Sequence, residues 1–285
     1  MTTGVSKSEL HRRLFSQGFE PSRALGQNFL VDANIARKIA YEASIGQKAR
    51  AIEVGPGAGS LTVFLAEYFE QVLAVEADRA LTAELQSTLM ERGITNVEVV
   101  NDDILAFDFI HAGFDLLPTV VVGNLPYNIA SQIILRVLER AWYVESVIVM
   151  VQAEMADRLL APVGSRNSSA FGVHVALMAS TRQVLTVPAS VFVPPPKVGS
   201  KVIRLDRVRD PLSIVDPRLY DTIVWVVRLT FGHRRQMLRR ALTPEQGAIV
   251  GSLGIAVTRR PESLLLDEWI AIGRALEEAG LGAPA

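Results

Sequence analysis

Four residues that follow an apolar run could hold the amine of a flat base. Residues 119–123 are rich in β-branched side chains and predict a buried strand, and the residues standing where it ends are Asn124, Leu125, Pro126 and Tyr127. Open α/β sheets bind ligands at that edge. The Asn124 amide oxygen and the Leu125 carbonyl, held beside a rigid proline, can accept both hydrogens of an exocyclic amine, while the Tyr127 ring faces the base. The alternative is an ordinary strand-to-turn junction, in which Asn and Pro are common.

A glycine-rich turn lies between a second apolar strand and a helical pattern. Residues 51–62 read AIEVGPGAGSLT, and apolar residues at helical spacing follow. Alternating glycines let the backbone approach a ligand closely and aim the NH groups of a helix N-terminus at it, which makes Gly55 and Gly57 candidate contacts. The GxGxG spacing differs from the GxGxxG of dinucleotide sites. A simple tight turn is the alternative.

Carboxylates stand at the ends of the next two predicted strands. Glu76 ends the strand 73–76, where the Rossmann arrangement has a ribose-binding carboxylate, and would take both ribose hydroxyls. After strand 97–100 we prefer Asp103 to Asp102 as the carboxylate near the adenine amine of a bound nucleoside. Taken singly, Glu76 could be a surface carboxylate and Asp103 a helix cap. Together the strand ends describe one crevice with a nucleoside half and an amine-reading half.

These motifs resemble those of the ribosomal RNA adenine dimethyltransferases, most closely the KsgA-type enzymes of the small subunit. Residues 23–30, RALGQNFL, are similar to the family's N-terminal box, whose Asn and Leu close over S-adenosylmethionine; here these are Asn28 and Leu30. The segments EVGPGAGSLT, VEAD and NLPYNIAS are similar to its cofactor and catalytic motifs. The resemblance therefore implies further cofactor contacts at Gly55, Glu76, Asp103 and Asn124.

The resemblance runs nearly from end to end. Residues 187–198 are similar to the family's Pro-rich segment, and residues 231–238 to its basic C-terminal helix. It implies methyl transfer from S-adenosylmethionine to the exocyclic amine of two adjacent adenines near the 3′ end of small-subunit rRNA, giving dimethyladenosine during ribosome biogenesis. The partner would be rRNA in a pre-ribosomal particle, and the protein would be a cytoplasmic monomer.

The implied catalytic residues are those of the strand-end tetrapeptide: Asn124, Leu125, Pro126 and Tyr127. Adenine's exocyclic nitrogen is a poor nucleophile because its lone pair is delocalised into the ring. Accepting both of its hydrogens favours a pyramidal nitrogen and stabilises the charge that develops there. The base must also leave its stack, and Tyr127 below it with Phe192 above it would stabilise the extruded base.

Three residues depart from the family's pattern. Phe171 keeps an aromatic ring where the family has Tyr but lacks the hydroxyl, His174 replaces an aliphatic residue, and Gly199 stands where an acidic residue is usual. They fall in RNA-facing and packing regions. They therefore bear on the grip on the substrate rather than on the reaction.

The composition excludes some classes of site. The chain has no cysteine, so it has no disulfide framework, thiolate nucleophile or zinc ribbon. The four histidines are scattered and lack the close pairing of a metal site, so we expect no metal. The first residues offer no signal-peptide core, and no apolar run is long enough to span a membrane.

The charge balance is unusual for an RNA-binding protein. Lys and Arg total 29 against 30 Asp and Glu, so RNA contacts require an uneven distribution of charge. Cations cluster between residues 204 and 240, and if residues 220–242 form one helix, Arg228, Arg235 and Arg239 share a stripe. These three, with Arg234 and Lys197, are the candidate RNA contacts. The alternative is a solvated face. In that case RNA capture would fall to a group around the mouth of the site: Arg12, Arg13, Arg23 and Lys197.

The pattern of elements predicts an α/β fold: a Rossmann-like class I methyltransferase sheet, mostly parallel with an antiparallel edge strand, and a small all-helical C-terminal domain. Strand and helix alternate from about residue 43 to 171, and residues 146–151 are the fifth strand. Segments 180–187 and 200–208 should pair around the Pro-rich loop. The last helix should span residues 263–278. We expect a methyltransferase domain with an N-terminal helical lid over residues 1–208, and an RNA-contacting helical domain over residues 209–285.

Other functions on such a chain remain open. One is the same chemistry on large-subunit rRNA, as in antibiotic-resistance relatives, or on DNA adenine; the Pro-rich loop and the helical C-terminal domain favour the small subunit. Another is a non-catalytic assembly or transcription factor, which would have no need of Glu76 and Asn124. A third is an NAD-dependent dehydrogenase, which the glycine spacing and the tetrapeptide 124–127 disfavour.

Overall fold

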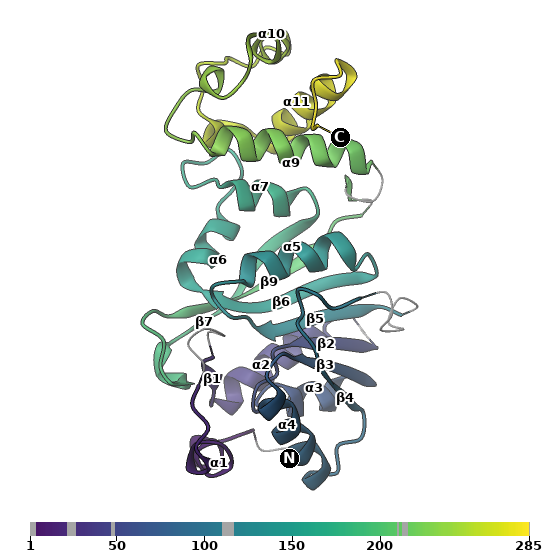
Figure 1. Cartoon of the computed structure of the whole chain (residues 1–285), viewed down its shortest axis with the longest axis vertical. Coiled ribbons are helices and arrows are strands. Elements are labelled where there is room, and N and C mark those ends of the chain that lie inside the picture. Colours follow the sequence, from purple (N-terminus) through teal and green to yellow (C-terminus); the bar gives the residue numbers. More distant parts are fainter. Residues whose placement is uncertain are drawn as a thin grey trace. The chain divides into compact units, whose positions relative to one another are not determined.

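A seven-stranded sheet is the framework of the chain (Figure 1). The computed structural model describes residues 4–21, 27–46, 49–109, 117–209, 211–212 and 216–284. The strand order is β4-β3-β2-β5-β6-β9-β7. The strands are β2 (Arg50–Val54), β3 (Gln71–Glu76), β4 (Val97–Asn101), β5 (Thr119–Asn124), β6 (Val144–Gln152), β7 (Ala179–Val187) and β9 (Ser200–Arg207).

The pairing directions confirm the predicted sheet. Every pair from β4 through β6 is parallel, whereas β9 runs antiparallel to β6. The two segments expected to pair around the Pro-rich loop, β7 and β9, are neighbours. The chain runs outward from β2 through β3 to β4 and then returns to β5 on the other side of β2. This reversal opens a crevice between the carboxyl ends of β2 and β5.

Helices cover the sheet and supply its core. In one buried cluster Ile39 of α2 and Phe64 of α3 pack with Val72 and Val122 of the strands, and burial on both faces explains the continuous apolar runs of β2 and β5. The helices are α1 (Lys7–Arg13), α2 (Ala33–Ser44), α3 (Thr62–Tyr68), α4 (Arg79–Glu91), α5 (Ala130–Arg140), α6 (Ala153–Leu160), α7 (Ala170–Ala176), α9 (Pro217–Phe231), α10 (Pro244–Ser252) and α11 (Leu266–Glu278).

A small second sheet joins two segments that are far apart in the sequence. β1 (Phe29–Leu30) pairs antiparallel with β8 (Phe192–Val193), and the Val31 amide donates to the Val191 carbonyl at 2.9 Å. The N-terminal box therefore lies beside the Pro-rich segment. The periodicity of the sequence did not predict these two short strands, because two residues carry no detectable alternation.

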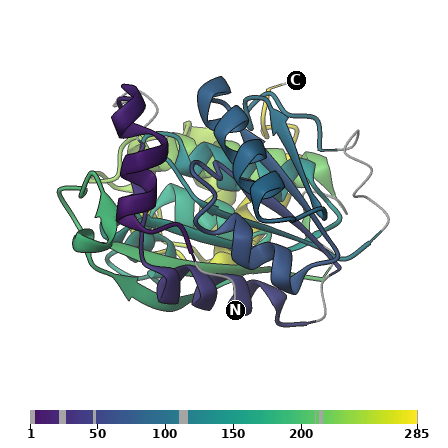
Figure 2. The same ribbon diagram turned by 90° about the horizontal axis from the view of Figure 1, so that it is seen from below.

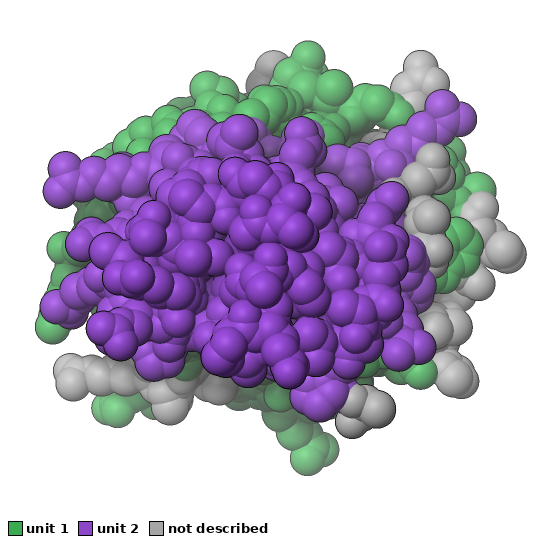
Figure 3. Space-filling view, turned by 90° about the horizontal axis from the view of Figure 1, so that it is seen from above, with its two compact units in different colours: residues 1–156, 182–206 green, residues 157–181, 207–285 purple. Residues whose placement is uncertain are grey.

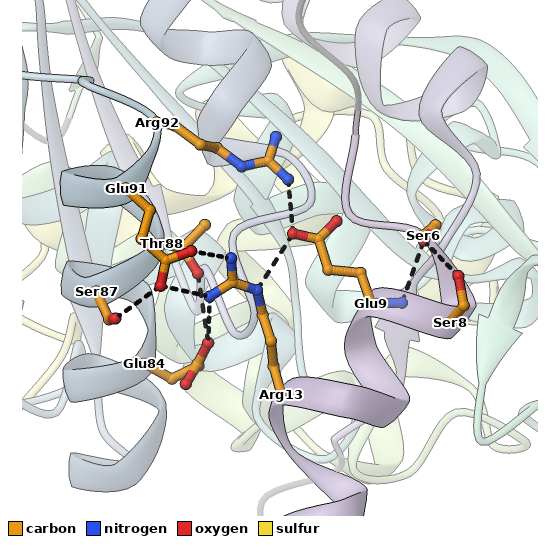
Figure 4. Close-up of polar contacts among 9 residues, drawn as sticks. All are labelled: Ser6, Ser8, Glu9, Arg13, Glu84, Ser87, Thr88, Glu91 and Arg92. Atoms are coloured by element: carbon orange, nitrogen blue, oxygen red, sulfur yellow. Dashed lines mark hydrogen bonds and ion pairs between the residues drawn. The ribbon is translucent and has the colours of Figure 1, made fainter.

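Charged side chains fasten α1 to α4 (Figure 4), and the ribbons of the two helices are also drawn in Figure 2. Arg13 bridges the two helices, with nitrogen–oxygen distances of 3.2 Å to Glu9, 3.1 Å to Glu84 and 2.6 Å to Glu91. Arg92 reaches back to Glu9 at 2.8 Å. Burial alone would raise the pKa of Glu9, but the hydrogen bonds and charges of Arg92 and Arg13 outweigh it and lower that pKa. Arg13 is thus engaged by carboxylates, which weakens the case for it as a phosphate contact.

An apolar cluster lies beneath the ion pairs. Leu10 and Leu14 of the N-terminal segment pack with Leu81 of α4, and the same cluster contains Phe29 and Ala58 of the glycine turn. The docking of α1 is therefore connected to the segment that carries Asn28. We expect a disturbance of α1 to reach the glycine turn through these contacts.

Replacing Arg13 by Ala should loosen α1, because Glu84 and Glu91 lose their shared cation and Glu9 keeps only Arg92. Backbone amides of α1 should then exchange with solvent several-fold faster, since these contacts are only partly buried and individually weak. Hydrogen exchange read by mass spectrometry measures this. Lys7→Ala, an exposed cation in the same helix, is the matched control. Equal exchange in Arg13→Ala and Lys7→Ala would contradict a fastening role.

The chain forms two compact units, coloured in Figure 3. The first comprises residues 1–156 and 182–206, and the second residues 157–181 and 207–285. The second unit takes in the segment 157–181 with α7, which the expected division at residue 208 placed in the first domain. Its buried His174 is hydrogen-bonded to the Tyr220 hydroxyl of α9, and that hydroxyl also contacts the Met178 sulfur at 3.4 Å. The His174 side chain, which departs from the family's pattern, therefore packs within the second unit.

Residues 220–242 do not form one helix, so the condition for a single stripe of arginines is not met. α9 ends at Phe231, and Gly232 caps it. Beyond the turn, the amides of Leu238 and Arg239 donate to the carbonyls of Arg259 and Val257 at 2.9 and 3.0 Å, which draws the chain out of the helical path. The final helix also begins later than predicted, because residues Pro261–Ser263 form a 3-10 turn before α11. Among the helices described, none is both long and apolar enough to cross a bilayer.

Candidate functional site

A cavity of about 330 Å³ lies at the carboxyl ends of the central strands. It falls in the first unit, at the crevice that the strand reversal opens. The predicted cofactor contacts that line it are Asn28, Leu30, Gly55, Gly57, Glu76 and Asp103. The tetrapeptide Asn124, Leu125, Pro126 and Tyr127 lines it as well. The volume suits a small-molecule ligand.

The turn after β2 requires glycine at two positions that line the cavity. Gly55 and Gly57 adopt φ angles of 64° and 57°, a region that other residues enter only with strain. A Cβ on Gly55 would meet nothing within 4 Å, so the backbone there borders open space. A Cβ on Gly57 would lie 3.2 Å from the Phe29 ring. One glycine thus leaves room for a ligand, and the other lets the N-terminal segment pack closely.

Glu76 holds the turn from the end of β3. Its Oε2 accepts the Gly57 amide at 3.0 Å and its Oε1 accepts the Asp78 amide at 2.9 Å. The side chain is 6% exposed, and burial raises its pKa while the amides of Asp78 and Gly57 oppose the rise. Each carboxylate oxygen has a second lone pair, so the group can still accept hydrogen bonds from a ligand.

Glu53, to which no motif gave a role, lies on β2, just before the turn. It is 1% exposed, lines the cavity, and has an Oε2 with no hydrogen-bond partner among the described residues. Burial raises its pKa to about 8, with the Thr62 hydroxyl opposing and the charge of Glu76 adding to the rise. An acidic residue inside an otherwise apolar strand was the sequence signal that could have identified it.

Asn124 is oriented by the N-terminal box. Its Nδ2 donates to the Asn28 carbonyl at 2.8 Å, which assigns the other atom of the amide as the oxygen. Among the described residues no donor is hydrogen-bonded to that Oδ1. The box and the tetrapeptide, 96 residues apart in sequence, thus meet at the cavity, and the contact leaves an acceptor available at Asn124.

The other tetrapeptide residues are fixed on the neighbouring strand and on β9. The Leu125 amide donates to the Met150 carbonyl at 3.1 Å, and its side chain is buried. The Tyr127 hydroxyl lies 3.1 Å from the Ser200 hydroxyl. Burial raises the pKa of Tyr127, and the Ser200 hydrogen bond opposes the rise. The ring is therefore neutral at physiological pH and anchored at its tip.

Asp103 lies at the cavity, whereas Phe192 lies outside its lining. Asp103 lines the cavity and is exposed, and its Oδ1 accepts the Leu105 amide at 2.9 Å, so it also stabilises the following turn. Asp102 lines the cavity as well, and its Oδ1 accepts the Asp103 amide at 2.7 Å. Phe192 is 2% exposed and packs in the core with Leu30, outside the cavity lining. This placement does not fit the expected stacking position opposite Tyr127, because the pairing of β8 with β1 turns the ring into the core.

The candidate RNA contacts are all exposed: Arg228, Arg234, Arg235, Arg239 and Lys197. Arg234 also donates to the Arg166 carbonyl at 2.7 Å. Because α9 ends at Phe231, the arginines do not form a single helical stripe. Arg23, an alternative contact, lies outside the described residues, as does Gly26 of the N-terminal box.

The surroundings of the other two residues that depart from the family's pattern differ. Gly199 has no positive φ, and its carbonyl accepts the Ala153 amide at 3.0 Å, so the backbone there does not require glycine. Phe171 is half-buried in the second unit. Across the described ranges, no group of three or more His, Cys, Asp or Glu side chains could hold a metal ion.

Comparison with known proteins identifies the family. The model of the ribosomal RNA adenine dimethylase family matches residues 18–256, more than half of the chain. The chain belongs to this family. Its relatives include the ribosomal RNA small subunit methyltransferase A of Moorella thermoacetica, 39% identical over 92% of this chain and 94% of the relative. The protein of that name from Cutibacterium acnes is 38% identical over 98% of this chain and 96% of the relative.

Two solved structures have a fold similar to that of this chain. A dimethyladenosine transferase from Plasmodium falciparum superposes with a TM-score of 0.76 at 23% identity, covering 89% of this chain and 99% of that one. The 23S rRNA methyltransferase ErmE superposes with a TM-score of 0.64 at 26% identity, covering 88% and 100%. These structures share the Rossmann-like sheet found here. Membership of the family and the names of the relatives show that the protein is a methyltransferase.

Glu53 should make stability depend on pH. Its pKa is about 8 in the folded protein and near the ordinary 4.5 when unfolded, so its ionisation costs stability progressively as pH rises between these values. Glu53→Gln should therefore be more stable than wild type near pH 7, by on the order of 1–3 kcal/mol, with a flatter pH profile. Urea unfolding at several pH values measures this.

The control for Glu53 is Glu67→Gln, an exposed carboxyl on α3. It should follow the wild-type profile, because its carboxyl remains in water in both states. If Glu53→Gln shows the same pH profile as wild type, the carboxyl ionises freely and its burial does not govern stability.

Proposed function

We propose that the protein transfers methyl groups from S-adenosylmethionine to the exocyclic amine of adenines in small-subunit rRNA, two adjacent residues near the 3′ end, giving dimethyladenosine during ribosome assembly. The observation that carries the proposal is that Glu76 and the tetrapeptide 124–127 line the same cavity. The same cavity thus offers a nucleoside-binding carboxylate to one ligand and an amine-reading loop to another.

The residues of the cavity fit S-adenosylmethionine. Glu76 offers acceptors for ribose hydroxyls, and the open space at Gly55 lets a ligand lie against the backbone. The unpartnered Oε2 of Glu53 is a buried acceptor just before the turn. Asn28, Leu30 and Asp103 would complete the contacts from the N-terminal box and the end of β4. When bound, S-adenosylmethionine would supply an electrophilic methyl group on a sulfonium.

The protein's own contribution is to hold and prepare the amine. Asn124 Oδ1 accepts one amine hydrogen and the Leu125 carbonyl the other, which localises the nitrogen lone pair and stabilises the developing positive charge. The Asn28 carbonyl fixes the Asn124 amide before the base arrives. Pro126 restricts the backbone, and the Tyr127 ring stacks on the extruded base. Alignment of the nitrogen with the methyl group supplies much of the acceleration.

The small subunit is favoured over the other substrates. The relatives from Moorella thermoacetica and Cutibacterium acnes carry small-subunit names and are 39% and 38% identical, whereas ErmE, named for 23S rRNA, is 26% identical. The chain retains Glu76 and Asn124, which supports catalysis over a purely structural role in assembly. The exposed arginines of the second unit would contact rRNA phosphates in a precursor of the small subunit.

The function is tested by offering the protein three unmethylated substrates: small-subunit particles, large-subunit rRNA and DNA. Tritiated methyl groups should enter the small-subunit particle. Primer extension should then stop at the modified adenines, because dimethylation blocks their pairing edge. Incorporation confined to large-subunit rRNA or DNA would assign a different substrate, and none at all would contradict the proposed enzyme.

Glu76→Ala should weaken S-adenosylmethionine binding. Two charge-assisted hydrogen bonds to the ribose would be lost, each worth on the order of 1.5–3 kcal/mol. Isothermal calorimetry measures the affinity. Because Glu76 also holds Gly57, thermal unfolding must be recorded in parallel to separate a disordered turn from a lost contact. Unchanged affinity would remove Glu76 from the cofactor site.

Asn124→Ala should lower the turnover number by roughly two orders of magnitude or more while leaving the fold intact, by analogy with the loss of one preorganised polar contact. Single-turnover methyl transfer measures the effect. Asn34→Ala, an exposed amide on α2 outside the cavity lining, is the matched control. Turnover near that of wild type would show that the amine is not held by Asn124.

Replacing Arg228, Arg235 and Arg239 together by Gln should weaken binding to the RNA particle and flatten its salt dependence, by a slope of roughly one per lost phosphate contact. Cofactor affinity should stay the same. The control replaces Arg260 and Arg274, exposed arginines elsewhere in the second unit. If the triple variant keeps the affinity and salt slope of wild type, these arginines form only a solvated face.

A further inference from the structure

The Tyr127 hydroxyl has a partner outside the motifs that predict the site. Ser200 Oγ lies 3.1 Å from Tyr127 Oη, within hydrogen-bonding distance, and either oxygen could donate. Ser200 is 0% exposed and lies outside the cavity lining, whereas Tyr127 lines the cavity. Ser200 can therefore act on a substrate only through the tyrosine.

The backbone holds Ser200 firmly in place. It is the first residue of β9 and pairs with Gln152, the last residue of β6. Next to it, the Gly199 carbonyl accepts the Ala153 amide at 3.0 Å. The tetrapeptide is tied to the same strand, since Asn124 pairs with Met150 and the Leu125 amide donates to the Met150 carbonyl. β6 thus supports both Ser200 and the tetrapeptide that contains Tyr127.

We infer that Ser200 is a positioning residue, whose hydroxyl holds the Tyr127 ring in its place at the cavity before the target base arrives. This inference rests on the proposed function, in which that ring stacks on the extruded adenine. Rotation about the Cα–Cβ bond of Tyr127 swings its hydroxyl, so the hydrogen bond at that tip fixes where the ring lies, whereas rotation about the Cβ–Cγ bond leaves the hydroxyl oxygen in place. The ordering of the ring is then complete in the free enzyme and does not oppose base binding.

The placement of Ser200 also links the ring to the Pro-rich segment. Residues 194–198 lead directly into Gly199 and Ser200, and Phe192 before them pairs with Leu30 of the N-terminal box. The hydroxyl pair therefore lies between the tetrapeptide and the segment that follows β8.

A double-mutant cycle tests the inference. Ser200→Ala and Tyr127→Phe each remove one hydroxyl and keep the ring, and each should lower the single-turnover rate roughly two- to tenfold, as expected for releasing one ordered side chain. The double variant should be no slower than either single variant, because both changes delete the same contact. The Michaelis constant for the RNA particle and the affinity for S-adenosylmethionine should not change.

A spectroscopic reading separates positioning from a general structural role. With 2-aminopurine in place of the target adenine, stacking on Tyr127 should quench its fluorescence in the wild type and less so in Ser200→Ala. Ser146→Ala is the matched control: it is a buried serine on β6 whose hydroxyl has no partner among the described residues, so its removal should leave rate and quenching unchanged.

The inference is overturned if Ser200→Ala slows the reaction equally in the Tyr127→Phe background, or if quenching is the same in Ser200→Ala and wild type. Should Ser200→Ala not fold, Tyr127→Phe alone decides, since unchanged quenching and rate in that variant would also overturn it. A wild-type protein that transfers no methyl to the particle would overturn the proposed function, and this inference with it.

Discussion

The hydrogen bond from the Gly57 amide to the Glu76 carboxylate is the contact on which the rest of the site depends. It joins the turn after β2 to the end of β3 inside the fold, at 3.0 Å. Gly57 can hold the left-handed conformation of that turn and admit the Phe29 ring against its backbone. Phe29 adjoins Asn28, whose carbonyl orients the Asn124 amide. One buried carboxylate thus connects the glycine turn to the N-terminal box and, through it, to the tetrapeptide 124–127.

The order of the strands along the chain explains why most residues of the cavity could be predicted from the sequence. Residues that follow successive parallel strands must meet at one edge of the sheet, so Gly55, Glu76, Asp103 and Asn124 could be grouped from strand ends alone. Their residue types then specify chemistry, because carboxylate, amide and backbone acceptors recognise hydroxyls and amines. The resemblance to a known family added the N-terminal box, whose Asn28 lies at no strand end of the large sheet.

What could not be predicted depends on contacts between distant segments. The end of α9 at Phe231 follows from backbone bonds to residues 257–259, and no local breaker except Gly232 signals it. Phe192 turns into the core because β8 pairs with β1, two strands too short to leave a pattern. The Ser200 hydroxyl reaches Tyr127 across 73 residues. Periodicity reports on burial along one element and carries no information about such pairings.

The most direct test of the account is a crystal structure of the protein with S-adenosylhomocysteine and a short RNA that carries the target adenine. We predict the ribose of the cofactor product on Glu76 and the adenine amine within hydrogen-bonding distance of Asn124 Oδ1, with the base on the Tyr127 ring. An adenine bound away from residues 124–127, or a cofactor product bound away from Glu76, would contradict a single cavity that serves both ligands.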